Sequence, residues 1–224
     1  QAVRGIRWRV PMANSPVLED TLTAGIQASF AGIGMGDTAE NLGEQYGIGR
    51  EASDEFALRS QTLARDAWAS GVYDAEVIPV PVTNPKTRQT EEFRRDEHMR
   101  PNSTADGLAK LRPVFRENGV VTAGNASGIG DGAAAMVIAS RDYADSNGLK
   151  PLGRLVSWGL AGVDPRIMGI GPVPASRSAL ERAHMSLDDM DLIEINEAFA
   201  TQACAVAAEM RIPREKPNIH GGAV

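Results

Sequence analysis

The sequence has little of several residue types on which common classes of protein depend. It holds a single cysteine, Cys204, among 224 residues, so no disulfide framework can form within the chain. One free thiol fits a reducing compartment, where structural disulfides are rare. The three histidines, His98, His184 and His220, are far apart, and their spacing matches no zinc motif. The sequence therefore predicts neither a disulfide-linked domain nor a metal site.

Basic charge and long apolar runs are also scarce. The chain has 23 Lys and Arg against 29 Asp and Glu, so no basic excess is present to meet nucleic-acid phosphates. No apolar run reaches the ~18 residues of a membrane-spanning helix. Arg4, Arg7 and Arg9 near the start have no apolar stretch behind them, unlike a secretory signal. Glycine-rich GxxxxGK[ST] and GxGxxG phosphate loops are absent too. We expect no nucleic-acid partner and no membrane span.

Helical patterns and short apolar runs occupy most of the chain, whose 42% hydrophobic and 23% charged residues are typical of a globular protein. Helices are expected over 37–46, 51–70, 141–147, 176–184 and 198–210, with a short one within 18–26 of an otherwise irregular 1–36. Strands are expected over 77–82, 120–123, 133–139, 151–159 and 192–195. The continuous apolar run at 133–139 is typical of a strand covered on both faces.

The stretch Leu192–Thr201, LIEINEAFAT, joins an expected strand to an expected helix. The apolar run ends at Asn196, and the helical pattern begins at Ala198. Proteins of the α/β class place ligand-binding groups where strands end, and an Asn amide there can orient a water or polarise a carbonyl oxygen. Asn is equally suited to capping the helix, so this stretch alone leaves both roles open.

Two further stretches provide a context for Asn196. Thr122–Ala135 reads TAGNASGIGDGAAA, and Asn218–Val224 reads NIHGGAV. Together with Asn-Glu-Ala-Phe, and in this order, they resemble signature motifs of the thiolases, the acetyl-CoA acyltransferases. The resemblance extends over the whole chain, but thiolases are nearly twice as long, so this sequence is similar to their central part.

The resemblance implies an α/β fold of the layered thiolase type, present in part. It divides the chain into a lid or loop domain at 1–128, the final strand and helix of the N-terminal half at 129–150, and the beginning of the C-terminal half at 151–224. Such a part would leave strand edges and apolar surface uncovered, so we expect partner chains or low stability. The complete enzyme is expected to be a homo-oligomer, a dimer or tetramer, in the cytoplasm or an organellar matrix.

The resemblance also makes coenzyme A a substrate, with no covalently bound cofactor. It implies that Asn196 holds a water that helps to stabilise the thioester oxyanion. The residues expected to contact coenzyme A or substrate are Met35, Arg100, Phe115, Ala123, Ser127, Met168, Ala198 and Phe199. Arg100 would meet the phosphates and adenine, because a guanidinium offers both charge and a planar face. Ala123 and Ser127 would line the pantetheine tunnel.

Several of these residues have an ordinary structural interpretation as well. Arg100 lies in the mixed-charge stretch 86–100, which is typical of a solvated surface. Phe115 suits a core, and Met168 suits a gap between packed elements. Met35 could simply plug a loop, and the small residues around Ser127 could form a tight turn. The residues alone leave these alternatives open.

The sequence lacks much of what thiolysis requires, namely a thiolate nucleophile, a base, an acid and an oxyanion hole. The resemblance places the nucleophilic cysteine upstream of residue 1 and the catalytic histidine after Val224, so His220 is not that histidine. Cys204 falls inside an Ala-rich helical pattern and is expected to be structural. Two hypotheses follow. The chain is part of a thiolase and inactive alone, or it is a non-catalytic thiolase-like module or subunit that binds acyl-CoA.

Overall fold

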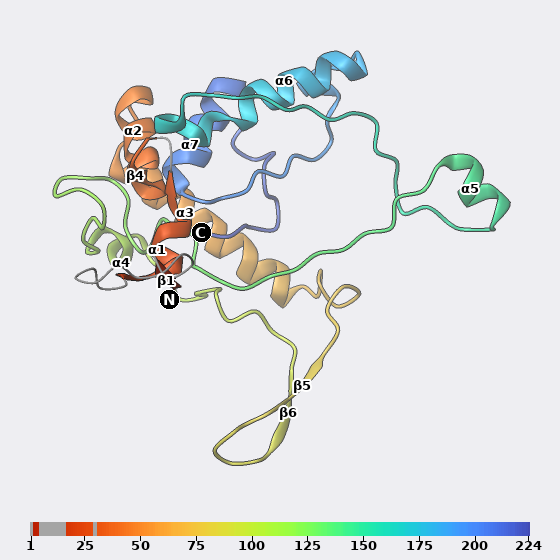
Figure 1. Ribbon diagram of the computed structural model, residues 1–224, viewed down its shortest axis with the longest axis horizontal. Coiled ribbons are helices and arrows are strands. Elements are labelled where there is room, and N and C mark those ends of the chain that lie inside the picture. The colour runs from red at the N-terminus through yellow and green to blue at the C-terminus, as the bar shows by residue number, and fades with distance from the viewer. Residues whose placement is uncertain (1, 5–16, 29–30) are drawn as a thin grey trace, which may run out of the picture.

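The computed structural model describes residues 2–4, 17–28 and 31–224. Its body is a group of helices from opposite ends of the sequence, with the C-terminus beside α3 (Figure 1). The group consists of α2 (Met35–Tyr46), α3 (Arg50–Ala69), the 3-10 helix η1 (Pro165–Ile170), α6 (Pro172–Ala183) and α7 (Ala200–Met210). Both α2 and α3 pack directly on α7, so the early helices and the Asn-Glu-Ala-Phe region belong to one packed unit.

Two apolar clusters fill the spaces within this unit. The first consists of Leu42, Ile170, Val173, Ala205 and Val206, and the second of Ala57, Leu108, Ala200 and Val224. Leu108 comes from the short helix α4 (Ala105–Ala109), which packs on α3. The small side chains of α7 allow its neighbours to approach closely, which is why an Ala-rich helix lies at the centre of the core.

The helices expected from the sequence are confirmed, with altered ends. Gly47 has φ 66° and closes α2, and Gly71 has φ 77° just after α3, a backbone region that favours glycine. The expected inner face of α3 is confirmed, since Ser60 and Ala67 are buried. α5 (Arg141–Ser146) lies within the expected range, and η2 (Leu187–Asp189) is preceded by the predicted Ser186 cap.

A hairpin extends away from the helical body (Figure 1). β5 (Val80–Thr83) pairs with β6 (Thr90–Phe93) in antiparallel register, with Val80 opposite Phe93. This confirms the strand expected over 77–82, although β5 begins three residues later, at Val80. A two-stranded sheet has only edge strands, which explains how Pro81 is accommodated.

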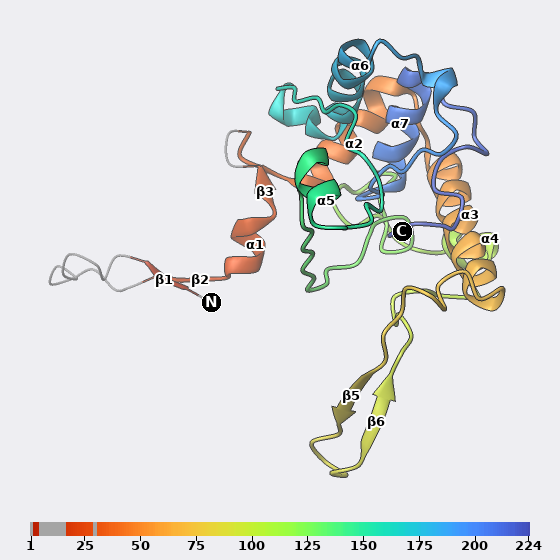
Figure 2. The same ribbon diagram turned by 90° about the vertical axis from the view of Figure 1, so that its right-hand side faces the viewer.

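The N-terminal segment extends from another side of the body (Figure 2). It contains β1 (Ala2–Arg4), β2 (Val17–Glu19), α1 (Thr21–Gly25), β3 (Gln27–Ala28) and β4 (Ile33–Gly34). α1 confirms the short helix expected within 18–26, and Asp20 caps it by accepting from the Leu22 and Thr23 amides. Of the irregular opening expected over 1–36, residues 1, 5–16 and 29–30 lie outside the described residues.

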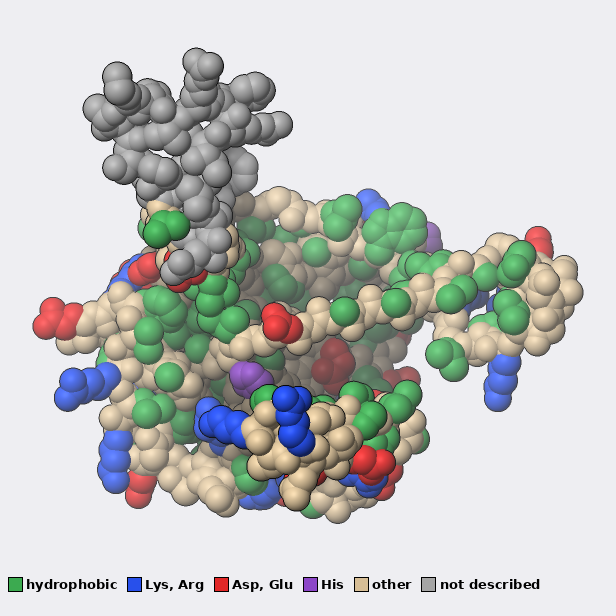
Figure 3. Space-filling model, turned by 60° about the horizontal axis from the view of Figure 1, so that its bottom comes forward, with side chains coloured by type: hydrophobic (Ala, Val, Ile, Leu, Met, Phe, Trp, Pro, Cys, Tyr) green, Lys and Arg blue, Asp and Glu red, His purple; other side chains and the backbone are tan. Residues whose placement is uncertain are grey.

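Four of the expected strands do not form. Residues 133–139 and 151–159 have no strand assignment, whereas 120–123 and 192–195 contribute only single bridges, Thr122 with Pro113 and Ile193 with Pro217. The prediction that 133–139 is covered on both faces is wrong for this structure, because no described strand lies alongside to complete the hydrogen bonds. Val137 is 95% exposed, and the arm that carries α5 stands out from the body with apolar side chains along it (Figure 3).

Within the described ranges, none of the helices combines the length and apolar character needed to cross a membrane.

Candidate functional site

The loop at 119–127 is fixed to the central helices by buried polar side chains. Glu40 of α2 is 3% exposed, and its two carboxyl oxygens accept hydrogen bonds from the Val120 and Val121 amides at 2.9 and 3.0 Å. The fully buried Asn125 donates to Asp54 of α3 at 2.8 Å. Because these acceptors sit on packed helices, the loop has little freedom to move.

This loop lies directly against the Asn-Glu-Ala-Phe motif. The Ser127 amide donates to the Ala198 carbonyl at 3.0 Å, and the Ala200 amide donates to the Asn125 carbonyl at 2.9 Å. Ala126 and Phe199 form the antiparallel bridge between them. Three residues expected at the site from the sequence, Ser127, Ala198 and Phe199, are therefore brought together.

Phe115 joins the same group through its ring. The Phe115 and Phe199 rings meet edge to face, with centroids 6.1 Å apart and an interplanar angle of 82°. Phe115 also lies over Gly36, where an added Cβ would come within 2.2 Å of the ring. Met35, the first residue of α2, is next to this contact in the chain and is half-buried. Phe115 itself is 40% exposed, so it is not the core residue that its ordinary interpretation predicts.

The segment containing Arg100 packs against Gly128, the residue after Ser127. The Arg100 amide donates to Gln61 Oε1 of α3 at 2.6 Å, which anchors the segment to that helix. The His98 ring covers Gly128 so closely that a Cβ there would come within 1.9 Å of it. The Arg100 side chain is exposed and forms no ion pair with another described residue, as a side chain available to an anionic ligand would be.

Asn196 does not cap α7. The helix begins at Ala200, its N-cap is Phe199, and no side chain caps it. Asn196 is exposed, whereas its neighbour Glu197 is only 1% exposed. The capping interpretation is therefore wrong, and the amide of Asn196 points away from the packed side of the chain.

Glu197 was not among the residues expected at the site, yet it is one of the most buried charged residues described. Its Oε2 accepts from Ser60 Oγ at 2.6 Å and from the Val224 amide at 3.2 Å, and its Oε1 accepts from Asn218 Nδ2 at 2.7 Å. Ser60 Oγ in turn accepts from the Gly222 amide at 2.9 Å. The signal that could have revealed it is a carboxylate between an apolar run and an Ala-rich helix, where a charge needs partners.

Family models match nearly the whole chain. Residues 1–142 match the model described as "Thiolase, N-terminal domain" and residues 149–224 match "Thiolase, C-terminal domain". The chain belongs to the thiolase family.

Curated relatives and solved structures agree with this assignment. An acetyl-CoA acetyltransferase of Syntrophomonas wolfei is 47% identical in an alignment of 222 positions that covers 97% of this chain and 55% of that protein. The mitochondrial 3-ketoacyl-CoA thiolase of Bos taurus is 46% identical over 99% of this chain and 55% of that protein. The crystal structure of human mitochondrial 3-ketoacyl-CoA thiolase has a TM-score of 0.92 and 43% identity, covering 99% of this chain and 55% of that chain. The partial thiolase fold expected from the sequence is thus confirmed, and the chain spans about half the length of these relatives.

Two further residues expected at the site in this thiolase chain are Met168 and Ala123. Met168 is on η1, which packs against α2 and α7, and its side chain is 42% exposed. Ala123 is exposed, and Gly124 after it packs under Leu111, where a Cβ would come within 2.4 Å of Leu111 Cδ1. The close approach expected for the small residues of this loop is confirmed at Gly124.

Cys204 has the surroundings of a structural thiol. It is half-buried on α7, and burial raises the pKa of the thiol to about 11, against a smaller opposing effect of Arg214. Such a thiol is neutral near pH 7 and is a poor nucleophile. No group of three or more His, Cys, Asp or Glu side chains in the described part of the thiolase chain is arranged to hold a metal ion.

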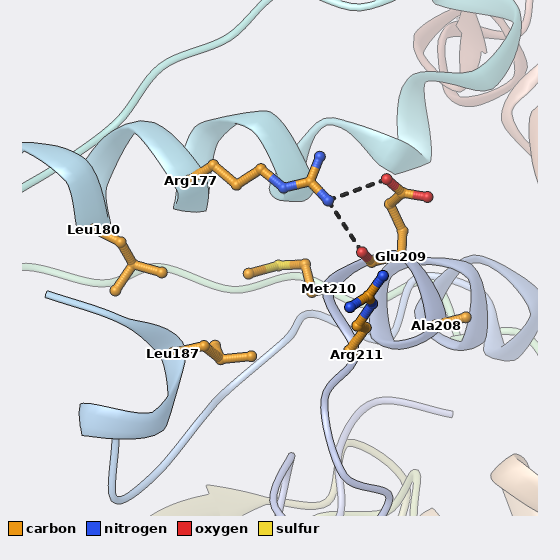
Figure 4. Close-up of a pocket in the computed structure, with 7 residues that line it drawn as sticks. All are labelled: Arg177, Leu180, Leu187, Ala208, Glu209, Met210 and Arg211. Atoms are coloured by element: carbon orange, nitrogen blue, oxygen red, sulfur yellow. Dashed lines mark hydrogen bonds and ion pairs between the residues drawn. The ribbon is translucent and has the colours of Figure 1, made fainter.

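Two of the hollows formed by the described residues are lined by none of the predicted site residues. One, of about 690 Å³, lies between α3, the 96–99 segment and the 220–224 segment. The other, of about 470 Å³, lies between α6 and the end of α7 (Figure 4). In it, Arg177 Nη2 donates to the Glu209 carbonyl and carboxylate, both at 3.1 Å, so this guanidinium already has an acidic partner within the protein.

Proposed function

We propose that the chain takes part in thiolase-type acyl transfer between coenzyme A thioesters, either thiolysis of 3-ketoacyl-CoA or condensation of acetyl-CoA. The observation that carries the proposal is the hydrogen-bonded pairing of the Ser127 loop with Ala198 and Ala200, beside an exposed Asn196. The names of the relatives support both directions, since one is an acetyl-CoA acetyltransferase and others are 3-ketoacyl-CoA thiolases.

Coenzyme A is proposed as a substrate, and no cofactor is proposed to be covalently held. Arg100 would meet its phosphates and adenine, and Ser127 and Ala123 would line the pantetheine path toward Phe199. The exposed Arg100 side chain and the nearby Ser127 loop support this order along the ligand. A similar solved structure, with a TM-score of 0.90 and 42% identity, is described as human mitochondrial 3-ketoacyl-CoA thiolase in complex with CoA.

The chemical role proposed for this chain is stabilisation of the thioester oxyanion. The carbonyl oxygen gains negative charge when a thiolate attacks, and the Asn196 amide would hold a water that donates to it. Cys204 is not proposed as the attacking group, because burial keeps its thiol neutral. Met35 and Met168 would contribute apolar surface near the thioester and the acyl group.

The organisation proposed for the chain is a lid or loop domain at 1–128, the end of the N-terminal half at 129–150 and the beginning of the C-terminal half at 151–224. A homo-oligomer, dimer or tetramer, in the cytoplasm or an organellar matrix is proposed for the complete enzyme. The exposed apolar arm around α5 supports partners for the chain, since an apolar surface of this kind is usually covered.

The alternative function is a non-catalytic thiolase-like module that binds acyl-CoA. The same coenzyme A contacts would serve such a module, so binding alone does not separate the two. Chemistry does, because only acyl transfer depends on an oxyanion-stabilising group.

The test uses a chimera in which residues 1–224 replace the matched 222 residues of the Syntrophomonas wolfei relative, which supplies the rest of the protein. We expect the chimera to cleave acetoacetyl-CoA with coenzyme A, and Asn196→Ala to lower kcat by about a hundredfold or more. Asn147→Ala is the matched control, since Asn147 is an exposed Asn at the C-cap of α5. Acetoacetyl-CoA binding without turnover by a folded chimera would favour the non-catalytic module.

A further inference from the structure

The residues leading to Asn196 alternate between the inside and the outside of the protein. Ile193 and Ile195 are half-buried and Glu197 is fully buried, whereas Glu194 and Asn196 are exposed. Alternation with a period of two is that of an extended chain, in which neighbouring side chains point to opposite sides. The direction of the Asn196 amide is therefore set by whatever holds Glu197 inward.

Three donors hold Glu197, and they come from three parts of the molecule. Ser60 belongs to α3, Asn218 follows the bridge at Pro217, and Val224 lies in the Gly-Gly-Ala segment. Both carboxyl oxygens accept hydrogen bonds, so these donors fix both the position and the rotation of the Glu197 carboxylate. No described Lys or Arg forms an ion pair with it, which makes these neutral donors its whole support.

Asn218 also holds the backbone of the same segment, at Ile195. Its amide nitrogen donates to the Ile195 carbonyl at 2.8 Å as well as to Glu197, and its Oδ1 accepts from the Ile195 amide at 2.8 Å. The side chain of Asn218 thus takes the place of a neighbouring strand for Ile195. It also has φ 52°, a backbone conformation that Asn tolerates better than most residues.

The Gly-Gly-Ala segment is shaped to fit this arrangement. A Cβ on Gly222 would come within 2.2 Å of the Glu197 carboxyl carbon, and one on Gly221 would come within 2.4 Å of the Ser60 carbonyl. Only residues without a side chain let the backbone pass between α3 and Glu197. Ser60 completes the connection by donating to Glu197 while accepting from the Gly222 amide.

We infer that Glu197 is a positioning residue for the acyl transfer proposed above, and this inference rests on that proposal. Its carboxylate holds Asn196 outward, toward the reacting carbonyl of that proposal, by tying the segment that carries Asn196 to α3 and to the 221–224 backbone. Ser60 is the second member of this clamp, which we define as Ser60, Glu197, Asn218 and the Gly222 and Val224 amides.

The most obvious variant, Glu197→Gln, puts a donor beside a donor. If the NH₂ of Gln takes the place of Oε1, it meets the side-chain NH₂ of Asn218, which is also a donor. If it takes the place of Oε2, it meets the backbone N–H of Val224, which is a donor too. A loss of activity in Glu197→Gln would therefore not distinguish misfolding from misplacement of Asn196. Ser60→Ala is gentler, because it removes one hydroxyl and leaves the carboxylate and its two other donors in place.

Ser53→Ala is the matched control for Ser60→Ala. Ser53 is on the same helix and is 0% exposed against 1% for Ser60. Its hydroxyl is hydrogen-bonded to Thr201 Oγ1 at 2.8 Å, outside the clamp. Loss of a buried hydroxyl hydrogen bond is thus common to both variants, and only Ser60→Ala touches Glu197.

The kinetic experiment compares the two variants in the chimera. We expect Ser60→Ala to lower kcat by roughly 10- to 100-fold with less than about a threefold change in KM for coenzyme A, as expected from a small misplacement of a group that acts in the transition state. Ser53→Ala should lower the melting temperature about as much as Ser60→Ala does, but its kcat should stay within about twofold of the parent chimera. Equal kcat values for both variants would overturn the inference, whereas a folded, inactive parent chimera would overturn the proposed function instead.

A second readout needs no activity. Amide hydrogen exchange in the 224-residue chain should be slow at Gly222 and Val224. Ser60→Ala should speed it at Gly222, whose amide loses its acceptor, whereas Ser53→Ala should not. Fast exchange at these two amides in the unsubstituted chain would show that the clamp is absent and would contradict the inference.

Discussion

Buried carboxyl groups connect the central helices to the loops of the proposed site. Glu40 holds the amides of Val120 and Val121, Asp54 holds Asn125, and Glu197 joins α3 to the end of the chain. Each has hydrogen-bonding partners that offset the cost of removing a charged group from water. None of the three was predicted from the sequence. Glu40 and Asp54 lie in helical patterns, where a carboxylate looks like a surface residue until the loop that it holds is known.

Arg100 is predicted to bind coenzyme A in both the ground state and the transition state. In the chimera, Arg100→Ala should raise KM for coenzyme A about tenfold or more while kcat changes less, because a charge-assisted contact contributes roughly 1.5–3 kcal/mol. Arg94→Ala is the control, since its guanidinium is 62% exposed and pairs with Glu92. An unchanged KM in Arg100→Ala would remove this residue from the site.

Cys204 is predicted to react slowly while the protein is folded. Burial raises its pKa to about 11, and an unfolded cysteine titrates near 8.5, so the thiolate fraction at pH 8 should fall about a hundredfold on folding. Because the folded pKa is the higher one, the stability that the neutral thiol contributes is present below about pH 8.5 and is lost as pH rises toward 11. Alkylation by iodoacetamide at pH 8, in buffer and in urea, measures the difference. Equal rates would show an accessible, activated thiol.

At the scale of elements, the helices were predictable and most strands were not. Helices such as α3 satisfy their own backbone, so periodicity and a closing glycine at Gly71 suffice to locate them. A strand such as 133–139 depends on a neighbour that its own residues do not encode. For the site, the motifs identified Ser127, Ala198 and Phe199 as candidates, but only the fold showed that Ser127 pairs with Ala198 and that its neighbour Ala126 pairs with Phe199.

The exposed run at 133–139 is expected to become a strand once the rest of a thiolase surrounds it. In the chimera, its amides should exchange with solvent at least about tenfold more slowly than in the 224-residue chain, because a paired strand opens rarely. The amides of α3 provide the internal control and should be protected in both proteins. Equal exchange at 133–139 in the two proteins would contradict its assignment as a strand.

The Gly-Gly-Ala segment gives a stability prediction at the same scale. Gly221→Ala should lower the free energy of unfolding by roughly 1–3 kcal/mol, since its Cβ would overlap backbone of α3 and its φ of 79° disfavours alanine. Gly153→Ala is the matched control, because nothing lies within 4 Å of the Cβ that it adds. Urea titration of the two variants measures both changes, and a neutral Gly221→Ala would show that the segment does not pack as described.

At the scale of the whole molecule, the chain is a packed helical unit with extensions whose apolar surface is uncovered. Leu152, Leu155, Trp158 and Leu160 are all more than half exposed, as are Met136, Val137 and Ile138 before α5. The chain matches 55% of the length of the Syntrophomonas wolfei relative, and it includes the residues that we propose contact coenzyme A and stabilise the oxyanion. It lacks an activated thiolate among its own residues, as Cys204 is its one cysteine.

The most direct measurement is the rate of coenzyme A-dependent cleavage of acetoacetyl-CoA by the 224-residue chain and by the chimera, assayed side by side. We expect no cleavage above background by the chain, because no thiolate is available to attack, and we expect turnover by the chimera. Turnover by the chain alone that disappears when Cys204 is alkylated would instead make Cys204 the nucleophile.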